Sequence, residues 1–139
     1  MNALVVYDWK FGNTKRVAEA IGEAIGGRVL HVKDVGSSAV QGSDLVIVGS
    51  PTYGGFPTAG IDALVKDSPT IAQMNAAVFD IRTKRTIFGY AAPKMARNLE
   101  KDGAILLAPL EGFFVSGRKG PLRDGELERA AAWAKGLAG

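Results

Sequence analysis

The chain has 139 residues, 47% of them hydrophobic and 22% charged, a balance typical of a globular protein with an apolar core. It contains no cysteine and a single histidine, which excludes disulfides, thiolate catalysis and metal sites built from cysteine or clustered histidine. The formal net charge of +3 favours anionic ligands in general but is too small to indicate nucleic acid binding.

Five short runs rich in valine, isoleucine and leucine predict strands that are buried on both faces of a sheet. They lie at residues 3–7, 28–32, 44–49, 76–81 and 104–110. Segments with helical spacing lie between and after them, at residues 13–25, 60–67, 90–101 and 125–138, with a weaker, turn-like piece at residues 37–41. This alternation predicts an α/β fold in which helices cover both faces of a parallel sheet. Trp133, on the last helix, is expected to belong to the core.

The sequence predicts a protein that is neither membrane-bound nor exported. No apolar run approaches the ~20 residues of a membrane span, and Met1 is followed by a strand-like segment rather than by a basic leader. No long linker, repeat or low-complexity tract divides the chain. We therefore expect one cytoplasmic domain over residues 1–139.

A wound parallel sheet binds its ligand beyond the carboxyl ends of the strands, where the strand order reverses. This rule selects the loops at residues 8–14, 50–57 and 82–89. In the first loop, Gly12 can approach a ligand closely, and Asn13 or Thr14 can cap the helix that follows. The free N–H groups and the dipole of that helix would favour an anion. An ordinary capped helix start is the alternative.

The segment YDWKFGNT, together with VGSPTYGG at the third predicted strand, resembles the flavodoxin family, and the order of elements agrees over essentially the whole chain. The resemblance implies a five-stranded parallel sheet in the strand order 2-1-3-4-5 that binds one flavin mononucleotide (FMN). In that family the first loop reads Ser/Thr-x-Thr-Gly-x-Thr and binds the FMN phosphate. Laid on residues 9–14, Gly12 and Thr14 match this pattern, whereas Trp9 and Phe11 replace hydroxyl residues.

The phosphate contacts that the resemblance implies therefore depend on groups other than these hydroxyls. Backbone N–H groups at the turn do not depend on side chains, and Lys10 can supply a positive charge, with Lys15 and Arg16 nearby. We expect weaker phosphate binding than in a typical flavodoxin. The residues expected to contact the phosphate are Trp9, Lys10, Phe11, Gly12, Asn13 and Thr14.

The second loop, SPTYGGFPT, combines an aromatic side chain with flexible glycines. Tyr53 matches the place where flavodoxins stack an aromatic ring on the flavin, and backbone amides of the loop suit the polar edge of that ring. A plain turn with an exposed tyrosine is the alternative. The resemblance implies flavin contacts from Ser50, Pro51, Thr52, Tyr53, Gly54 and Gly55.

The third loop, RTKRTIFGY, follows the family pattern least, because basic residues stand where flavodoxins usually carry a second aromatic ring and acidic neighbours. Arg85 lies about where that ring would be, and arginine can also stack. Two interpretations stay open, a solvated basic loop or a rim that attracts an anionic cofactor or substrate. The contacts expected on this side of the flavin come from Asp80, Arg82, Thr83 and Arg85.

Two aspartates, Asp8 and Asp80, lie near the carboxyl ends of strands and could form a functional pair. The interpretation we favour is that each accepts backbone N–H groups and orients its loop. His31 is expected to be structural, which leaves no base for a hydrolase built on Ser50 or Ser116. The sequence also lacks the third-strand aspartate of receiver domains, the cysteine of tyrosine phosphatases, and the glycine patterns of NTPases and dinucleotide sites.

The leading interpretation is a small FMN-binding protein that transfers electrons, with the flavin as its redox group, no catalytic side chain and no metal. An electron carrier is favoured over an FMN-dependent quinone reductase, because the sequence shows no obvious nicotinamide site. The alternative from another class is a binding or regulatory module with the flavodoxin fold that has lost FMN and binds some other anion. We expect neither nucleic acid nor a membrane as a partner, and the sequence does not identify the redox partner protein.

Overall fold

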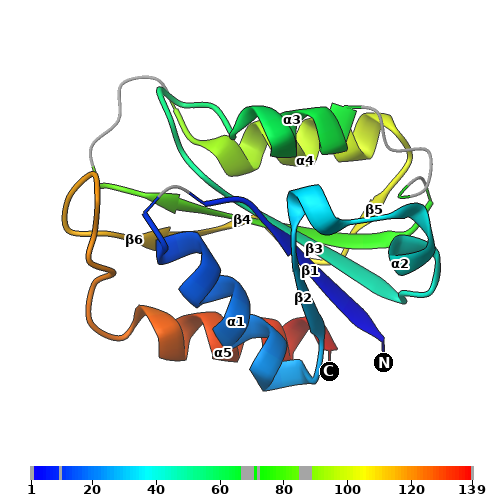
Figure 1. Ribbon diagram of the computed structural model, residues 1–139, viewed down its shortest axis with the longest axis horizontal. Helices are drawn as coiled ribbons and strands as arrows, with labels where there is room; N and C mark the ends of the chain where they lie inside the picture. The colour runs from blue at the N-terminus through cyan, green and yellow to red at the C-terminus, as the bar shows by residue number, and fades with distance from the viewer. Residues whose placement is uncertain (1, 10, 67–70, 72, 85–88, 139) are drawn as a thin grey trace.

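A parallel β-sheet forms the centre of the computed structural model, with helices packed on both of its faces (Figure 1). The structure describes residues 2–9, 11–66, 71, 73–84 and 89–138. The strands lie in the order β2-β1-β3-β4-β5, which confirms the predicted order, and β6 also pairs with β4. Their bounds are Ala3–Tyr7 (β1), Arg28–His31 (β2), Leu45–Pro51 (β3), Asn75–Arg82 (β4), Ile105–Leu106 (β5) and Glu111–Phe114 (β6).

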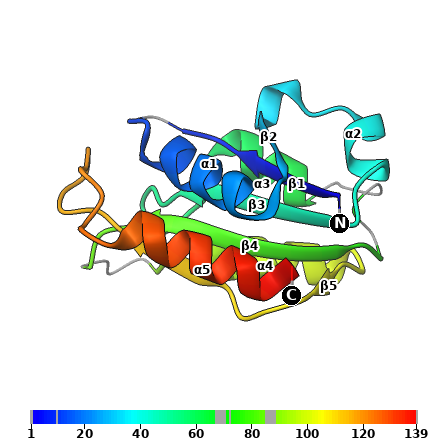
Figure 2. The same cartoon turned by 90° about the horizontal axis from the view of Figure 1, so that it is seen from below.

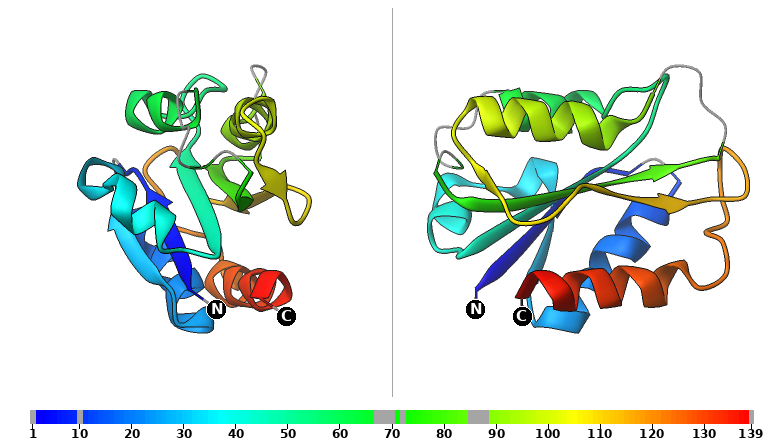
Figure 3. Two further views of the ribbon diagram at one scale, coloured as in Figure 1. Left: turned by 90° about the vertical axis from the view of Figure 1, so that its right-hand side faces the viewer. Right: turned by 180° about the vertical axis from the view of Figure 1, so that it is seen from behind.

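The longer helices form two layers, one on each face of the sheet (Figure 3). One layer contains α1 and α5, which lie side by side when the molecule is seen from below (Figure 2), and the other contains α3 and α4. The helices are α1 (Asn13–Ile25), α2 (Ser37–Gln41), α3 (Ala59–Lys66), α4 (Ala91–Lys101) and α5 (Glu126–Ala138), with a 3₁₀ turn η1 (Val32–Asp34) after β2. None of the helices in the described ranges is long and apolar enough to span a membrane.

The side chains of β1 explain why both faces of the sheet are covered. Val5 packs in one cluster with Val17 and Ile21 of α1. Leu4 and Val6 pack in a second cluster with side chains of α3 and α4. Successive side chains of a strand point to opposite faces, so a strand that is apolar at every position needs a cover on both.

Glycines in the left-handed conformation begin and end α1. Gly12 precedes the helix with φ +86°, and Gly26 follows it with φ +66°. At the C-terminal end, the N–H groups of Gly26 and Gly27 both donate to the Gly22 carbonyl, which satisfies one of the last carbonyls of the helix. At the N-terminal end, no described side chain caps the helix, and its first turn contains no acidic residue.

The fifth predicted strand, at residues 104–110, is wrong in its extent. Pairing with β4 stops after β5 and resumes only at β6. Residues 107–110 stand opposite just two residues of β4, so the chain leaves the sheet between the two strands and then returns. Pro109 lies in this interruption, and a proline has no N–H to donate to the neighbouring strand. Two short strands therefore occupy the fifth position of the sheet.

Phe79 of β4 is fully buried in the face covered by α1 and α5. Its ring lies edge-on to the ring of Phe113, with 5.9 Å between centroids, and to that of Trp133 at 6.2 Å. These contacts confirm that Trp133 packs on the core. Phe79 also lies over Gly49 of β3, where a Cβ atom would come within 2.0 Å of the phenyl ring. The Phe79 ring can therefore occupy this position only because residue 49 has no side chain.

We predict opposite effects from two glycine-to-alanine changes. Gly49→Ala puts a methyl group where the buried Phe79 ring lies, and it should lower the free energy of unfolding by about 1–3 kcal/mol. The matched control is Gly136→Ala on α5, where a Cβ meets no atom within 4 Å. It should raise the free energy of unfolding by about 0.5–1 kcal/mol. Urea unfolding measures both, and equal effects would contradict the packing described at Gly49.

Candidate functional site

The loops selected from the sequence leave the sheet at one edge. The strands β1, β3 and β4 are parallel neighbours, so their carboxyl ends lie together, on the left in Figure 1. A fourth segment, between β6 and α5, reaches the same edge and is orange in Figure 1. The sequence patterns did not single out this fourth segment.

The first loop turns at Gly12 and leads directly into α1. The φ of +86° at Gly12 is one that L side chains rarely adopt, so the backbone itself requires glycine there. The indole of Trp9 is 45% exposed and lies on this turn, because a Cβ at Gly12 would be 3.8 Å from two of its ring carbons. Lys15 places its Nζ 5.6 Å from the centre of the Trp9 ring. Lys10 lies outside the described residues.

Neither polar side chain that follows Gly12 is exposed at the turn. Asn13 donates from Nδ2 to the Lys119 carbonyl at 3.2 Å, and Thr14 is buried. The first turn of α1 therefore presents chiefly backbone N–H groups, which an α-helix leaves without intrahelical partners. Together with the Lys15 ammonium, these donors fit a phosphate group or another compact anion.

Residues 115–122 form a hairpin whose tip packs on the beginning of α1. We call it the basic hairpin, because its tip carries Arg118 and Lys119. Backbone hydrogen bonds join its two arms. Gly120 fits against Asn13 so closely that a Cβ there would come within 2.7 Å of the Asn13 amide nitrogen. The hairpin tip is therefore held beside the first loop.

An ion-pair cluster at the start of α5 supports the base of the basic hairpin. The Glu126 carboxylate accepts the Phe114 N–H at 2.7 Å and pairs with Arg129 at 2.7 Å. Arg129 also pairs with Glu111, at 2.9 Å. The hydrogen bond from Arg129 is the main cause that keeps the pKa of Glu126 below its ordinary value. These contacts hold the hairpin in place where it leaves β6.

Hydrogen bonds within the second loop involve its hydroxyl groups. Ser50 Oγ donates to the Pro51 carbonyl at 2.8 Å and accepts the Thr58 N–H at 3.0 Å. Thr52 Oγ1 accepts the Ala91 N–H at 3.2 Å, which links the loop to the start of α4. Ser50 and Thr52 thus shape the loop through contacts inside the protein.

Tyr53 and Phe56 close a tight turn, in which their backbone groups exchange hydrogen bonds of 2.8 and 2.9 Å. Gly54 and Gly55 stand between them with φ +55° and +86°, as a two-residue hairpin turn requires. Phe56 is 60% exposed, and Lys94 of α4 covers its ring with Nζ 3.8 Å from the centre. Lys94 Nζ also donates to the Gly55 carbonyl, so α4 holds this turn.

Tyr53 lies within electrostatic reach of both the first loop and the basic hairpin. Burial raises the pKa of its phenol, the Asp8 carboxylate raises it further, and Arg118 lowers it. Charges act strongly on a group only over short distances in water. The hairpin tip contacts the first loop, and the second loop follows β3, the neighbour of β1, so the three segments border one region at this edge of the sheet.

Asp80 and Arg82, both predicted to contact a cofactor, pair with one another below the surface. Arg82 donates from Nε and Nη2 to the two carboxylate oxygens of Asp80, at 2.6 and 2.7 Å. Asp80 also accepts the Ala92 N–H in the first turn of α4, at 2.9 Å. Burial raises the pKa of the Asp80 carboxyl, and the Arg82 and Ala92 hydrogen bonds oppose that rise. The Tyr90 ring covers the guanidinium, whose carbon lies 3.5 Å from the ring centre.

This buried pair bears on whether the third loop forms a cationic rim that attracts an anion. The Arg82 side chain is 13% exposed and its charge is balanced by Asp80, so Arg82 is not part of a cationic rim. Thr83 is partly exposed at the end of the strand, and Lys84 is exposed beyond it. Arg85 lies outside the described residues.

Each of the two aspartates accepts a backbone N–H, as the favoured interpretation predicted. Asp80 bonds α4, and Asp8 accepts the Trp9 N–H at 2.8 Å. Asp8 also lies 3.0 Å from Nε2 of His31, whose Nδ1 accepts the Lys33 N–H. Both nitrogens of the histidine ring are thereby engaged, which confirms a structural role for His31.

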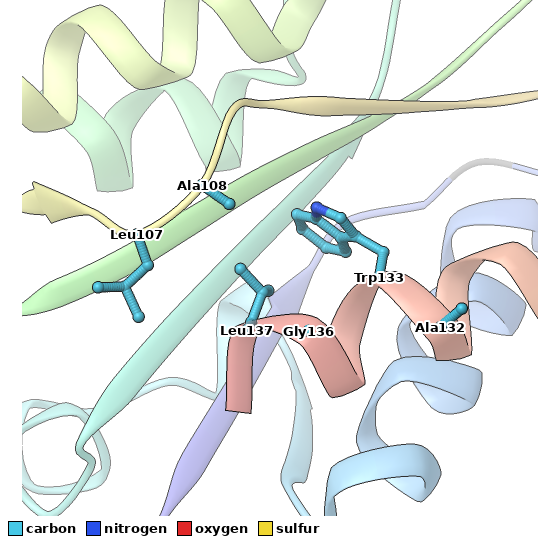
Figure 4. Close-up of a pocket in the computed structure, with 6 residues that line it drawn as sticks. All are labelled: Leu107, Ala108, Ala132, Trp133, Gly136 and Leu137. Atoms are coloured by element: carbon cyan, nitrogen blue, oxygen red, sulfur yellow. The ribbon is translucent and has the colours of Figure 1, made fainter. Parts of the chain in front are cut away.

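A hollow of the surface lies away from this edge. An apolar groove of about 440 Å³ separates the interruption at residues 107–110 from α5, with Trp133 and Leu137 facing Leu107 and Ala108 across it (Figure 4). It lies beside the middle of β4, because the interruption faces the centre of that strand. Within the described ranges, no group of three or more His, Asp or Glu side chains could hold a metal ion.

Comparison with solved structures assigns the fold. The chain matches a flavodoxin from the domain Archaea with a TM-score of 0.82 and 23% sequence identity, over 99% of this chain and 96% of the other. It matches flavodoxin 2 from Bacillus cereus with a TM-score of 0.83 and 18% identity, over 99% and 98%. Two-electron reduced flavodoxin from Megasphaera elsdenii matches with a TM-score of 0.74 and 17% identity, over 95% and 97%. No protein-family model and no curated protein matches the sequence.

The protein therefore has the flavodoxin fold, as the sequence resemblance implied. At these identities the comparison establishes the arrangement of the chain, while the ligand must be argued from the residues at the site. The structure brings the described residues of the first and second loops to one edge, and it places Asp80 and Arg82 beneath the start of α4. The basic hairpin was missed from the sequence, although SGRKGP combines turn-forming residues with two cations.

We predict that the Asp80–Arg82 pair is necessary for stability. Asp80→Asn leaves a largely buried guanidinium without its carboxylate, and should lower the free energy of unfolding by about 3–5 kcal/mol. The matched control is Asp62→Asn, which breaks the exposed pair with Lys66 on α3 and should cost less than about 1 kcal/mol. Chemical denaturation measures both changes. A loss at Asp80 as small as that at Asp62 would show that the pair is not buried as described.

Proposed function

We propose that the protein binds one FMN noncovalently at the carboxyl edge of the sheet and transfers electrons through it. The observation that carries the proposal is the first turn of α1. This turn follows Gly12, no described side chain caps it, and it belongs to a fold shared with flavodoxins. A matching structure is that of a flavodoxin in its two-electron reduced state, so this fold supports such chemistry in another protein. The donors at the turn match the charge and size of a phosphate.

In this proposal the phosphate lies against the first turn of α1. Backbone N–H groups of Asn13 and Thr14 donate to it, and Lys15 supplies positive charge. Trp9 and Phe11 contribute rings rather than hydroxyls, and the half-exposed Trp9 indole is placed to shield the anion from water. Lys10 stays a predicted contact.

The flavin ring is proposed to lie between the second loop and the basic hairpin. Tyr53 offers an aromatic face, and the glycines at 54 and 55 allow the backbone to approach the polar edge of the ring. Ser50, Pro51 and Thr52 maintain the shape of this loop. Bound FMN would supply one- and two-electron redox chemistry, and the residues of the chain would bind it, orient it and limit the access of water.

Asp80 and Arg82 act as positioning residues in this proposal. Asp80 holds the first turn of α4 through the Ala92 N–H. That helix in turn contacts the second loop through Thr52 and Lys94. Thr83 and Arg85, which follow the buried pair in the chain, remain predicted contacts on the far side of the flavin.

A binding module that has lost FMN is the second candidate function. The observation that favours it is the position of the Trp9 indole, which lies on the Gly12 turn where the family pattern has a hydroxyl residue. Such a module would bind a different anion at the same turn. Within the redox class, an electron carrier remains favoured over a quinone reductase, because the sequence offers no obvious nicotinamide site.

We predict that the protein quenches the fluorescence of micromolar FMN, and that Gly12→Ala weakens this binding by about tenfold or more. Alanine at a φ of +86° is strained by roughly 1–2 kcal/mol, so the turn must change shape to accept it. The matched control is Gly26→Ala, which puts the same kind of strain at the other end of the same helix. It should lower stability without changing the affinity for FMN.

Fluorescence titration with an absorbance scan decides between the two candidate functions. Colourless protein that ignores micromolar FMN would contradict the redox proposal and support the binding module. Equal FMN affinities for Gly12→Ala, Gly26→Ala and the unaltered protein would remove the first loop from the site.

A further inference from the structure

Exposed aromatic rings and cations occur together at the carboxyl edge of the sheet. Trp9 and Phe56 are two of the four exposed large hydrophobic side chains in the described part of the chain. Lys94 covers the Phe56 ring, and the tip of the basic hairpin lies beside the first loop. We call this surface the cationic edge, and it consists of Trp9, Phe56, Lys94, Arg118 and Lys119.

Two aspartates and two glutamates of the surrounding segments each have a partner within the protein. Asp80 is buried against Arg82, and Asp8 lies 3.0 Å from the ring of His31. The two glutamates at the base of the basic hairpin share Arg129. Arg118 and Lys119 are exposed, whereas these four carboxylates are buried or partly buried.

The cationic edge carries three formal positive charges, on Lys94, Arg118 and Lys119. Lys94 donates to a carbonyl, which leaves its ammonium charge in place. Arg123 and Asp124, exposed neighbours after the basic hairpin, cancel one another. The basic hairpin and Lys94 thus bring positive charge to this edge of the sheet.

We infer that the cationic edge docks an acidic protein that exchanges electrons with the bound flavin, an inference that rests on the proposed function. Aromatic side chains framed by charge resemble the core and rim of a protein–protein interface. A concentrated positive surface attracts and orients a partner with an acidic face. The hairpin tip contacts Asn13 of the first loop, so a protein docked here would lie beside the proposed FMN site.

A protein fits this surface better than a nucleic acid does. Single-stranded nucleic acid binds by stacking bases on open aromatic faces. The Phe56 ring already has Lys94 Nζ 3.8 Å from its centre, and the Trp9 indole lies on the Gly12 turn. Three cations also neutralise few phosphates, which would leave any such binding weak at physiological salt.

The test compares two double variants with the same change of charge. Arg118→Glu/Lys119→Glu reverses the hairpin tip, and the contact of the tip with α1 is preserved because it uses the Lys119 backbone carbonyl. Lys101→Glu/Lys135→Glu reverses two exposed cations in the last turns of α4 and α5, at the opposite end of the strands. Both variants lose four units of charge, so a difference between them reports the location of the charge.

The first measurement does not require flavin. Poly-L-glutamate is added at low ionic strength to the protein as purified, and amide NMR shifts report where and how tightly it binds. We expect shifts at the cationic edge and binding that is weakened about tenfold or more in the hairpin variant, with less than about twofold change in the control. An oligothymidylate of equal charge should bind more weakly than poly-L-glutamate.

The second measurement uses flavin-loaded protein that has been reduced with dithionite and freed of excess reductant. Each ferricyanide ion takes one electron from the reduced flavin. Because ferricyanide is anionic, the rate at which it oxidises the flavin should fall as salt is added. The rate with cationic hexaamminecobalt(III), which also takes one electron, should rise. The hairpin variant should slow ferricyanide about tenfold at low salt, whereas the control should change it little.

The outcomes separate the docking surface from the cofactor. Equal weakening of poly-L-glutamate binding by the two variants would overturn the inference, and tighter binding of oligothymidylate would replace the protein partner with a nucleic acid. If poly-L-glutamate binds at the cationic edge but FMN does not bind at all, the surface that binds acidic chains is supported. Both the electron exchange and the proposed function are then contradicted. FMN binding with equal ferricyanide rates in both variants would reject the docking surface alone.

Discussion

The candidate site depends on one backbone conformation, the left-handed turn at Gly12 that begins α1 without a described side-chain cap. The core holds this helix in place, because Val17 and Ile21 are buried against the sheet. The basic hairpin holds the same turn from outside, through the contacts of Asn13 with Gly120 and the neighbouring carbonyl. An anion bound here would meet donors that are already ordered, so its binding would cost little conformational entropy.

The electrostatics of this edge follow from which charges are paired. The sequence offered a cluster of basic residues at the third loop, but the structure balances Arg82 with the buried Asp80. Positive charge at this edge also comes from Lys94 and from the tip of the basic hairpin, which is more than a hundred residues from the first loop in sequence. The edge that is proposed to hold FMN is therefore also the edge with the exposed positive charge, and cofactor binding and partner choice share one surface.

Local patterns predicted much of the fold, because apolar runs and helical spacing are properties of neighbouring residues. The bounds of β1 and α1 agree with the sequence prediction, and the strand order agrees with the one that the flavodoxin resemblance implied. The fifth strand was placed wrongly, since a short apolar run around Pro109 resembles a strand although it leaves the ladder. The Asp80–Arg82 pair and the packing of the basic hairpin on Asn13 could not be predicted in the same way, because burial and long-range contacts have no local signature.

The central claim is that the first turn of α1 binds the phosphate of a flavin nucleotide. Its most direct test is to compare the dissociation constants of FMN and riboflavin, which differ only in that phosphate, at low and high ionic strength. The account predicts that FMN binds at least about tenfold more tightly than riboflavin at low salt, with a smaller but persistent difference at high salt, because the backbone donors remain when the Lys15 charge is screened. Equal dissociation constants for the two flavins would contradict it.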